Sequence, residues 1–258
     1  MMKPIYMFVP YWLGDFSPIL LGSARHTWRL LTPDLPDGSP TERMGALCRA
    51  LAEEVAAIRA SGHLPVVFVG DCTLSIGVLA GLQQEASDLS LVWYDAHGDF
   101  NTHDTSPSGF VGGMPLAMLC GRGEQTIVVG AGATVLPEAN VILTDARDLD
   151  PEEAEAVAES AVTHVPNVTD LASVSLPDRS LYIHFDCDVL SLSDLAAVSY
   201  PAEGGAALEV IDASLSHLAA TGQIAAISVT LWNPELDADG SAGEVVVGVI
   251  DRLLDQLS

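Results

Sequence analysis

The chain is poor in basic residues. Lysine and arginine together number 10, against 35 aspartate and glutamate residues, which gives a formal net charge of -25 over 258 residues. The phosphates of a nucleic acid would repel a protein of this charge, so we expect no nucleic-acid partner. Divalent cations would be attracted to it instead.

Long apolar runs and paired cysteines are also lacking. No stretch approaches the roughly 18 apolar residues of a membrane span, so we expect no membrane partner. Residues 1–10 carry one lysine and no small-residue cleavage site, which favours a first strand over a signal peptide. The absence of a CxxC pair is typical of a reducing compartment, and we expect a cytoplasmic protein. The four scattered cysteines are Cys48, Cys72, Cys120 and Cys187.

Short apolar runs alternate with amphipathic stretches along the chain. The first amphipathic stretch has the clearest helix start, because Ser39 can cap it, Pro40 fits its first turn and Glu42 completes a capping box. Uninterrupted apolar runs suit strands that helices cover on both sides. The sequence therefore predicts one domain over residues 1–258, an α/β fold with a doubly wound, mainly parallel sheet and helices on both faces. We predict strands at 5–9, 65–69, 91–94, 126–129, 141–143, 181–185 and 225–229, and helices at 40–61, 74–84, 151–160, 206–220 and 242–257.

Acidic residues, with histidine or cysteine among them, directly follow three of the predicted strands. The carboxyl ends of parallel strands form one edge of a sheet, where such folds bind ligands. Residues two apart in extended backbone point the same way, so the acidic residues of one segment can converge while Cys187 faces the core. The three segments are Asp71-Cys72, Asp95-Ala96-His97-Gly98-Asp99 and Asp186-Cys187-Asp188.

Carboxylates gathered this closely indicate a metal site. They cannot all stay ionised in a semi-buried crevice unless cations are present. Carboxylate oxygens with one imidazole suit a divalent ion such as manganese, and two ions could share a bridging aspartate. The alternative interpretation is that these are solvated loop acids in an acidic protein.

The same three segments resemble the signatures of the arginase/ureohydrolase family, which are GGDH, DAHxDxN and a later DxD after a strand. They occur in the same order over roughly residues 64–257, and the stretch DAHGDFNT from Asp95 is the most specific. The resemblance implies an enzyme with two Mn²⁺ ions, bridged by Asp95 and Asp186. The metal ligands that it implies are Cys72, Asp95, His97, Asp99, Asp186 and Asp188.

Amino-acid recognition is implied by the same resemblance. Ser108 and Asn101 stand where the family contacts the α-carboxylate of its substrate. Arg147-Asp148-Leu149-Asp150-Pro151-Glu152-Glu153 resembles the family's R-D-x-D-P-x-E stretch, which makes Asp150 and Glu153 candidates for the α-amino group. A cap for the helix that starts at Pro151 is an equally open interpretation of Asp150.

Three positions depart from the family pattern. Cys72 replaces a histidine, and its sulfur shifts the metal preference toward softer ions. Gly112 stands where the family has a histidine that moves protons, and His103 on the same loop is either its substitute or an ordinary exposed side chain. Leu231 replaces a glutamate that helps to hold the guanidinium. A site without that histidine and glutamate is poorly equipped for arginine, whose guanidinium stays protonated.

An N-hydroxyguanidine is less basic than a guanidine and is therefore more available as a neutral electrophile. The cysteine and glycine together resemble the branch of the family that converts N-omega-hydroxy-L-arginine to hydroxyurea and L-ornithine in D-cycloserine biosynthesis. In this interpretation a hydroxide bridging the two ions attacks the guanidino carbon, and Asp99 carries its proton to the leaving amine. The alternatives are an L-arginine or agmatine ureohydrolase and a catalytically silent metal-binding regulator. We expect a monomer that binds a small amino acid.

Overall fold

The computed structural model describes residues 2–86, 88–176, 178–230 and 232–257. Leu231, one of the three departures from the family pattern, lies outside the described residues. Eight strands form one sheet in the order β4-β1-β5-β10-β9-β6-β7-β8, and each neighbouring pair is parallel. The strands of this sheet are β1 (Pro4–Val9), β4 (Arg29–Leu30), β5 (Leu64–Val69), β6 (Leu89–His97), β7 (Val141–Asp148), β8 (Thr163–Val165), β9 (Ser180–Asp186) and β10 (Ile224–Thr230). A separate antiparallel hairpin pairs β2 (Tyr11–Trp12) with β3 (Asp15–Phe16).

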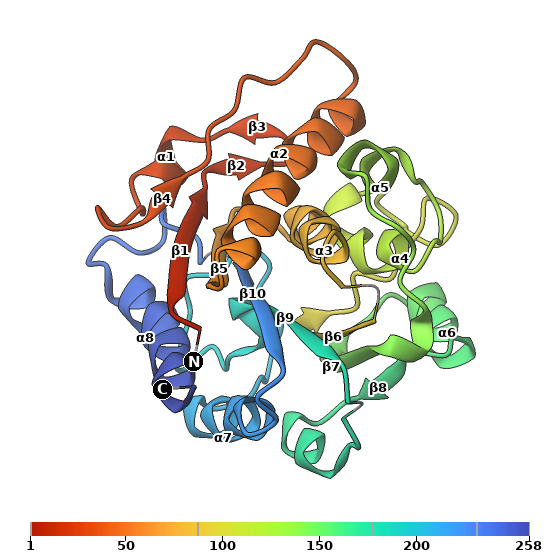
Figure 1. The fold of residues 1–258 in the computed structure, drawn as a ribbon. Helices are drawn as coiled ribbons and strands as arrows, with labels where there is room; N and C mark the ends of the chain where they lie inside the picture. The colour runs from red at the N-terminus through yellow and green to blue at the C-terminus, as the bar shows by residue number, and fades with distance from the viewer. Residues whose placement is uncertain (1, 87, 177, 231, 258) are drawn as a thin grey trace.

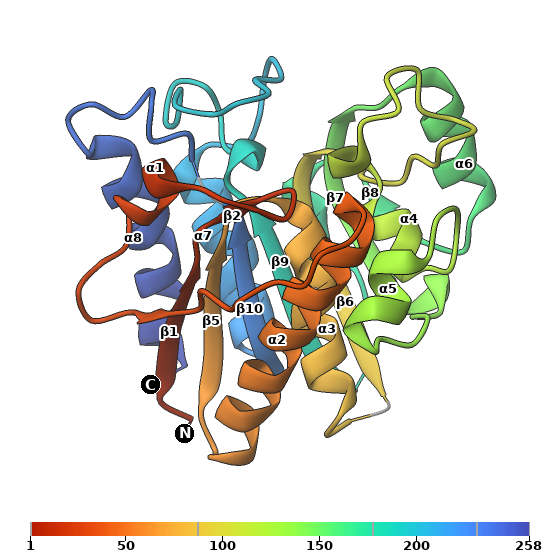
Figure 2. The same cartoon turned by 90° about the horizontal axis from the view of Figure 1, so that it is seen from above.

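Helices cover both faces of the sheet (Figure 1). On one face pack α2 (Pro40–Ala60), α3 (Ser75–Gln83), α4 (Pro115–Leu119), α5 (Thr126–Ala131) and α6 (Pro151–Glu159), and on the other α7 (Leu208–Ala219) and α8 (Ser241–Gln256). The short α1 (Pro18–Leu21) follows the hairpin beyond the carboxyl end of β1 (Figure 2). Short 3-10 helices lie at η1 (Cys72–Leu74), η2 (Val111–Gly113), η3 (Glu138–Asn140), η4 (Val168–Ser173) and η5 (Cys187–Val189). This arrangement confirms the predicted fold class. That residues 1–258 form one catalytic domain stays a prediction.

Local sequence explains the best-predicted elements. All six residues of β5 are buried, as its unbroken apolar run requires in a strand covered on both faces. Helix α2 starts as predicted, because the Ser39 hydroxyl accepts from the Glu42 N–H and the Glu42 carboxylate accepts from the Ser39 N–H. Its predicted length also agrees with the structure to within one residue.

The predicted strand at residues 126–129 is wrong, because these residues begin helix α5. A run of four β-branched residues, three of them apolar, has no periodicity that separates a strand from a buried helix turn. Packing decides the outcome: a Cβ at Gly45 of α2 would lie 3.0 Å from the Cα of Gly130, so glycine lets the two helices touch. Gly132, in the left-handed conformation, then ends α5.

Strand order places the functional segments together. The chain passes from β5 to β6, and the later strands β9 and β10 fill the space between them. The carboxyl ends of β5, β10, β9 and β6 are therefore neighbours along one edge. Among the described residues, no helix is both long and apolar enough to cross a membrane.

Candidate metal centre and substrate pocket

A pocket of about 230 Å³ opens at this edge of the sheet. Carboxylates dominate its lining, and no lysine or arginine is among the described residues that line it. Each of the six predicted metal-ligand positions contributes to the pocket. The titratable residues that line it are Asp71, Cys72, Asp95, His97, Asp99, Asp148, Asp150, Glu153, Asp186 and Asp188.

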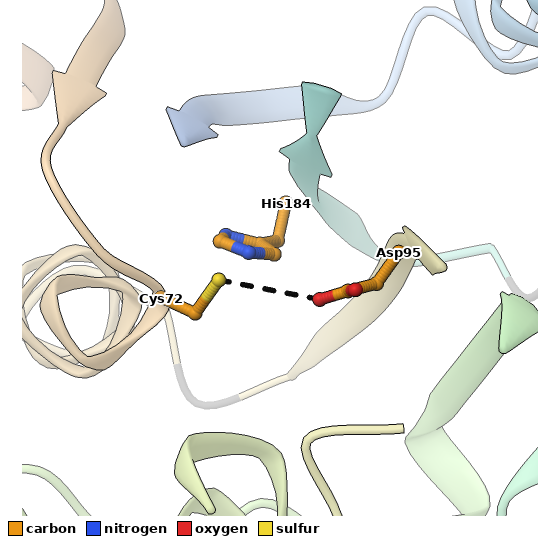
Figure 3. A group of neighbouring side chains, drawn as sticks. All are labelled: Cys72, Asp95 and His184. Carbon is orange, nitrogen blue, oxygen red and sulfur yellow. Dashed lines mark hydrogen bonds between the residues drawn. The ribbon is translucent and has the colours of Figure 1, made fainter. Parts of the chain in front are cut away.

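One cluster of donor atoms comes from the turn after β5 and from strands β6 and β9. Donor atoms of Cys72, Asp95 and His184 lie within 4.8 Å of one another (Figure 3). The Cys72 thiol lies 4.0 Å from Asp95 Oδ2 and donates to Asp186 Oδ2 over 3.1 Å. Burial, followed by the charges of the neighbouring aspartates, raises the pKa of the Cys72 thiol. Cys72 would therefore become a thiolate only when a cation compensates its charge.

A second cluster surrounds His97, whose Nδ1 lies 3.0 Å from Asp188 Oδ2 and 3.3 Å from Asp95 Oδ1. Burial on its own would lower the pKa of His97, but the hydrogen bonds to Asp188 and Asp95 outweigh it and raise the pKa to about 12. Asp95 belongs to both clusters, as a bridging ligand would.

The charges of the site need compensation. Burial, followed by the charge of Asp188, raises the pKa of Asp186 to about 7. Burial and the nearby aspartates also raise the pKa of Asp99, whose Oδ2 is buried and has no hydrogen-bond partner among the described residues. An unpartnered, buried carboxylate oxygen beside a carboxylate, imidazole and thiol set fits a divalent cation. The residues present thus fit the metal that the sequence implied.

Aspartates that cap their own backbone shape the three strand ends. Asp71 accepts from Thr73 N, Asp95 from His97 N over 2.7 Å, and Asp186 from Asp188 N over 2.9 Å. Each strand therefore ends in a turn that directs the following side chains toward the pocket. Cys187 packs in the core, as predicted.

The predicted reason for the placement of Asp99 is wrong, although Asp99 does line the pocket. Strand β6 ends at His97, and Asp99 has a φ of 49°, so extended alternation does not reach it. A left-handed turn returns its side chain to the site.

Sequence reasoning missed His184. It lies two residues before Asp186 on β9, so both side chains leave the strand on the same face, and this spacing was the available signal. The imidazole is fully buried, stacks on Trp93 at 3.8 Å and meets Ser228 Oγ at 2.8 Å. Burial lowers its pKa to about 3, so the ring is neutral. Thr230 Oγ1 lies 3.4 Å from His184 Nε2 and 3.3 Å from the Cys72 sulfur, connecting the two.

All four predicted substrate contacts line the pocket, and hydrogen bonds join three of them. Asn101 Nδ2 donates to Asp150 Oδ2 over 3.0 Å, and Glu153 accepts from the N–H groups of Asp150 and Phe100. Asp150 is the N-cap residue of α6 and also lines the pocket, so both interpretations of this residue have a structural basis. Burial raises the pKa of Glu153 to about 7. Ser108 lines the pocket from an exposed loop.

The two described departures from the family pattern have different surroundings. Cys72 lies among the carboxylates, whereas a Cβ at Gly112 would lie 2.4 Å from the ring of Phe110. The ring of Phe110 thus fills the space of a side chain at position 112. His103 is exposed and is absent from the described lining of the pocket, which favours the interpretation of an ordinary exposed side chain.

Known proteins share both the sequence and the fold of this chain. The arginase family model matches residues 21–254. Arginase from Bacillus subtilis is 32% identical in an alignment 217 residues long, which covers 79% of this chain and 73% of that protein. Arginase from Bacillus caldovelox is 31% identical in an alignment 216 residues long, which covers 79% of this chain and 72% of that protein. A crystal structure of the Bacillus subtilis arginase superposes with a TM-score of 0.81 at 27% identity and covers 98% of both chains. The chain therefore belongs to the arginase family, whose members are hydrolases of amidine carbon–nitrogen bonds.

Proposed function

We propose that the protein is a binuclear manganese amidinohydrolase that cleaves N-omega-hydroxy-L-arginine to hydroxyurea and L-ornithine. Cys72, Asp95, His97, Asp99, Asp186 and Asp188 would hold the two ions, and the clustering of these donors supports the assignment. When bound, the ions would lower the pKa of a water at the site and stabilise the negative charge that develops on the substrate.

Hydrolysis would split the substrate into hydroxyurea and L-ornithine. Water adds to the guanidino carbon, the bond from this carbon to the side-chain nitrogen breaks, and the released amine takes up a proton. Asp99 would carry this proton from water to the amine. Its carboxylate lines the pocket beside the other candidate ligands, which supports the role.

Asn101, Asp150, Glu153 and Ser108 would bind the amino-acid end of the substrate. Asn101 and Asp150 are already joined by a hydrogen bond, so one fixed pair would meet both charged groups of an α-amino acid. Agmatine lacks the α-carboxylate, which argues against it as the substrate.

The observation that carries the choice of substrate is the ring of Phe110 against Gly112. Among the described residues that line the pocket, His97 is the only imidazole, and Asp95 and Asp188 hold it. A substrate that is less basic than arginine and has its own hydroxyl group needs less help with proton transfer. The combination of Cys72 and Gly112 is the ground for placing the reaction in D-cycloserine biosynthesis.

L-Arginine is the second candidate substrate, favoured by the relatives that are named arginases. The test is L-ornithine release by manganese-loaded protein with L-arginine and N-omega-hydroxy-L-arginine side by side. A strong preference for the hydroxylated substrate is expected. Equal turnover would contradict the proposal and leave an arginase, and no turnover with two ions bound would favour a metal-binding regulator.

A further inference from the structure

Three aromatic side chains from distant segments line one part of the pocket. Trp12 comes from the β2–β3 hairpin, Phe110 from the loop before η2, and Tyr200 from the segment between η5 and α7. The rings of Trp12 and Tyr200 are stacked with centroids 6.5 Å apart, and those of Phe110 and Tyr200 lie 5.5 Å apart. We call these three residues the aromatic wall. Tyr200 is 50% exposed, although large apolar rings favour burial, so half of its surface is available to a ligand.

A side chain at position 112 would displace the ring of Phe110 from the wall. A Cβ there would lie 2.4 and 2.5 Å from two ring atoms of Phe110, closer than real Cβ atoms approach. The next residue differs, since a Cβ at Gly113 would meet nothing within 4 Å. Gly112 and Phe110 are therefore one unit, in which the glycine makes room for the ring.

Hydrogen bonds join the segments of two members of the wall to residues of the site. One lies beside a candidate metal ligand, and the other is a candidate substrate contact. On the hairpin, Leu13 N, next to Trp12, donates to Asp71 Oδ2 over 2.7 Å, and Asp71 precedes Cys72. On the loop, Phe110 N donates to Ser108 Oγ over 3.2 Å.

Arg147 anchors the segment that follows the third member, Tyr200. Its guanidinium donates to the carbonyl oxygens of Ala202 and Glu203 over 3.3 and 3.0 Å, close behind Tyr200. The same group donates to the carbonyl of Asp188 over 2.9 Å. The wall is thus fixed relative to the candidate metal centre before any ligand enters.

We propose that the aromatic wall determines specificity for the side chain of the substrate, packing against its methylene groups and its planar guanidine. The other described residues that line the pocket are mainly acidic or polar. The aromatic wall therefore supplies the large apolar surface of the pocket. Aromatic faces attract planar guanidine groups and methylene chains alike. The inference rests on the proposed function, since it assumes an amino acid with a guanidine-bearing side chain.

The first test measures binding of L-ornithine to manganese-loaded protein by calorimetry, with the shorter L-2,4-diaminobutyrate as the comparison. Phe110→Ala and Tyr200→Ala should each weaken L-ornithine binding about tenfold and reduce the preference for the longer ligand. Tyr200→Phe keeps the ring and should bind like wild type. Phe16→Ala is the matched control, because Phe16 is 45% exposed and lies on the neighbouring strand β3, outside the wall.

The second test uses the two adjacent glycines. Gly112→Ala should weaken L-ornithine binding as Phe110→Ala does, while Gly113→Ala should leave the affinity near that of wild type. Adding Gly112→Ala to Phe110→Ala should cause little further loss, because the ring that clashes is already gone. Manganese content and thermal unfolding of each variant identify any that fail to fold.

The outcomes separate this proposal from the proposed function. Wall variants that bind both ligands like wild type, equal effects of the two glycine variants, or a loaded wild type that does not bind L-ornithine would each overturn the role of the wall. Preference for L-arginine over N-omega-hydroxy-L-arginine, with wall variants still weakened, would instead reject only the proposed substrate.

Discussion

Replacing Arg147 with methionine tests how the pocket is held together. The Arg147 side chain is only 16% exposed, and it pairs with Asp145, whose side chain is 7% exposed. Methionine keeps much of the aliphatic bulk but none of the donors. The exchange therefore leaves Asp145 buried without its cation and frees four backbone carbonyls, those of Asp188, Val189, Ala202 and Glu203.

The expected cost is large for one substitution. Removing one partner of a buried ion pair costs about 3–5 kcal/mol, because the remaining charge is uncompensated. In a chain of this size, each kcal/mol shifts the Tm by about 2–4 °C. Arg147→Met should therefore lower the Tm by roughly 10 °C.

Thermal and guanidinium chloride unfolding, followed by circular dichroism on metal-free protein, would measure the effect. Arg252→Met is the matched control, because Arg252 pairs with Asp212 while 46% exposed and should lose less than about 1 kcal/mol. Adding Asp145→Asn to Arg147→Met should restore part of the stability, since no buried charge then remains. Equal, small losses in Arg147→Met and Arg252→Met would refute the reasoning.

Three other outcomes are expected. Asp99→Asn should reduce kcat about 100-fold or more while changing L-ornithine affinity less than about threefold in protein of verified manganese content; a parallel loss of both would remove its catalytic role. Cys72→His should lower the ratio of zinc to manganese affinity about tenfold in competition dialysis, with Cys120→Ser as the unchanged control; an unaltered ratio would mean that sulfur does not reach the metal. Arg122 donates to Glu138 over 2.6 Å, and this hydrogen bond holds the pKa of Glu138 below its ordinary value. The stabilisation of the folded protein by this hydrogen bond is therefore fully present above the ordinary pKa of glutamate. It is lost as the pH falls through the lower pKa that Glu138 has in the folded protein. NMR titration of Arg122→Met should show the Glu138 pKa moving up, and an unmoved pKa would contradict this origin.

Local patterns predicted the elements whose cause is local. The capping box of Ser39 and Glu42 lies within four residues, and the buried strands carry their apolar character in their own sequence. Residues 126–129 failed because the contact that decides their conformation, between Gly45 and Gly130, joins distant segments.

The residues of the candidate site also separate into those that local spacing predicts and those that only the fold brings into place. Asp95, His97 and Asp186 could be placed from spacing on two strands. Asp99 and Asp188 lie beyond the strand ends, Asp99 in a left-handed turn and Asp188 in η5, and spacing does not reveal either conformation. His184 carried a usable signal in its separation from Asp186. The aromatic wall carried none, because its members lie at least 90 positions apart and meet only through the fold.

The position of β9 and β10 between β5 and β6 has a consequence for biosynthesis. When β6 leaves the ribosome, the strands that will separate it from β5 have not yet been translated, so β5 and β6 each keep an open edge. At ordinary translation rates the wait until β10 has been made is on the order of ten seconds. Cys72 and Asp95 are made long before Asp186, and they meet only when the later strands insert between their own. The nascent chain must therefore avoid pairing those edges with other chains, and its candidate metal ligands come together only late in its own synthesis.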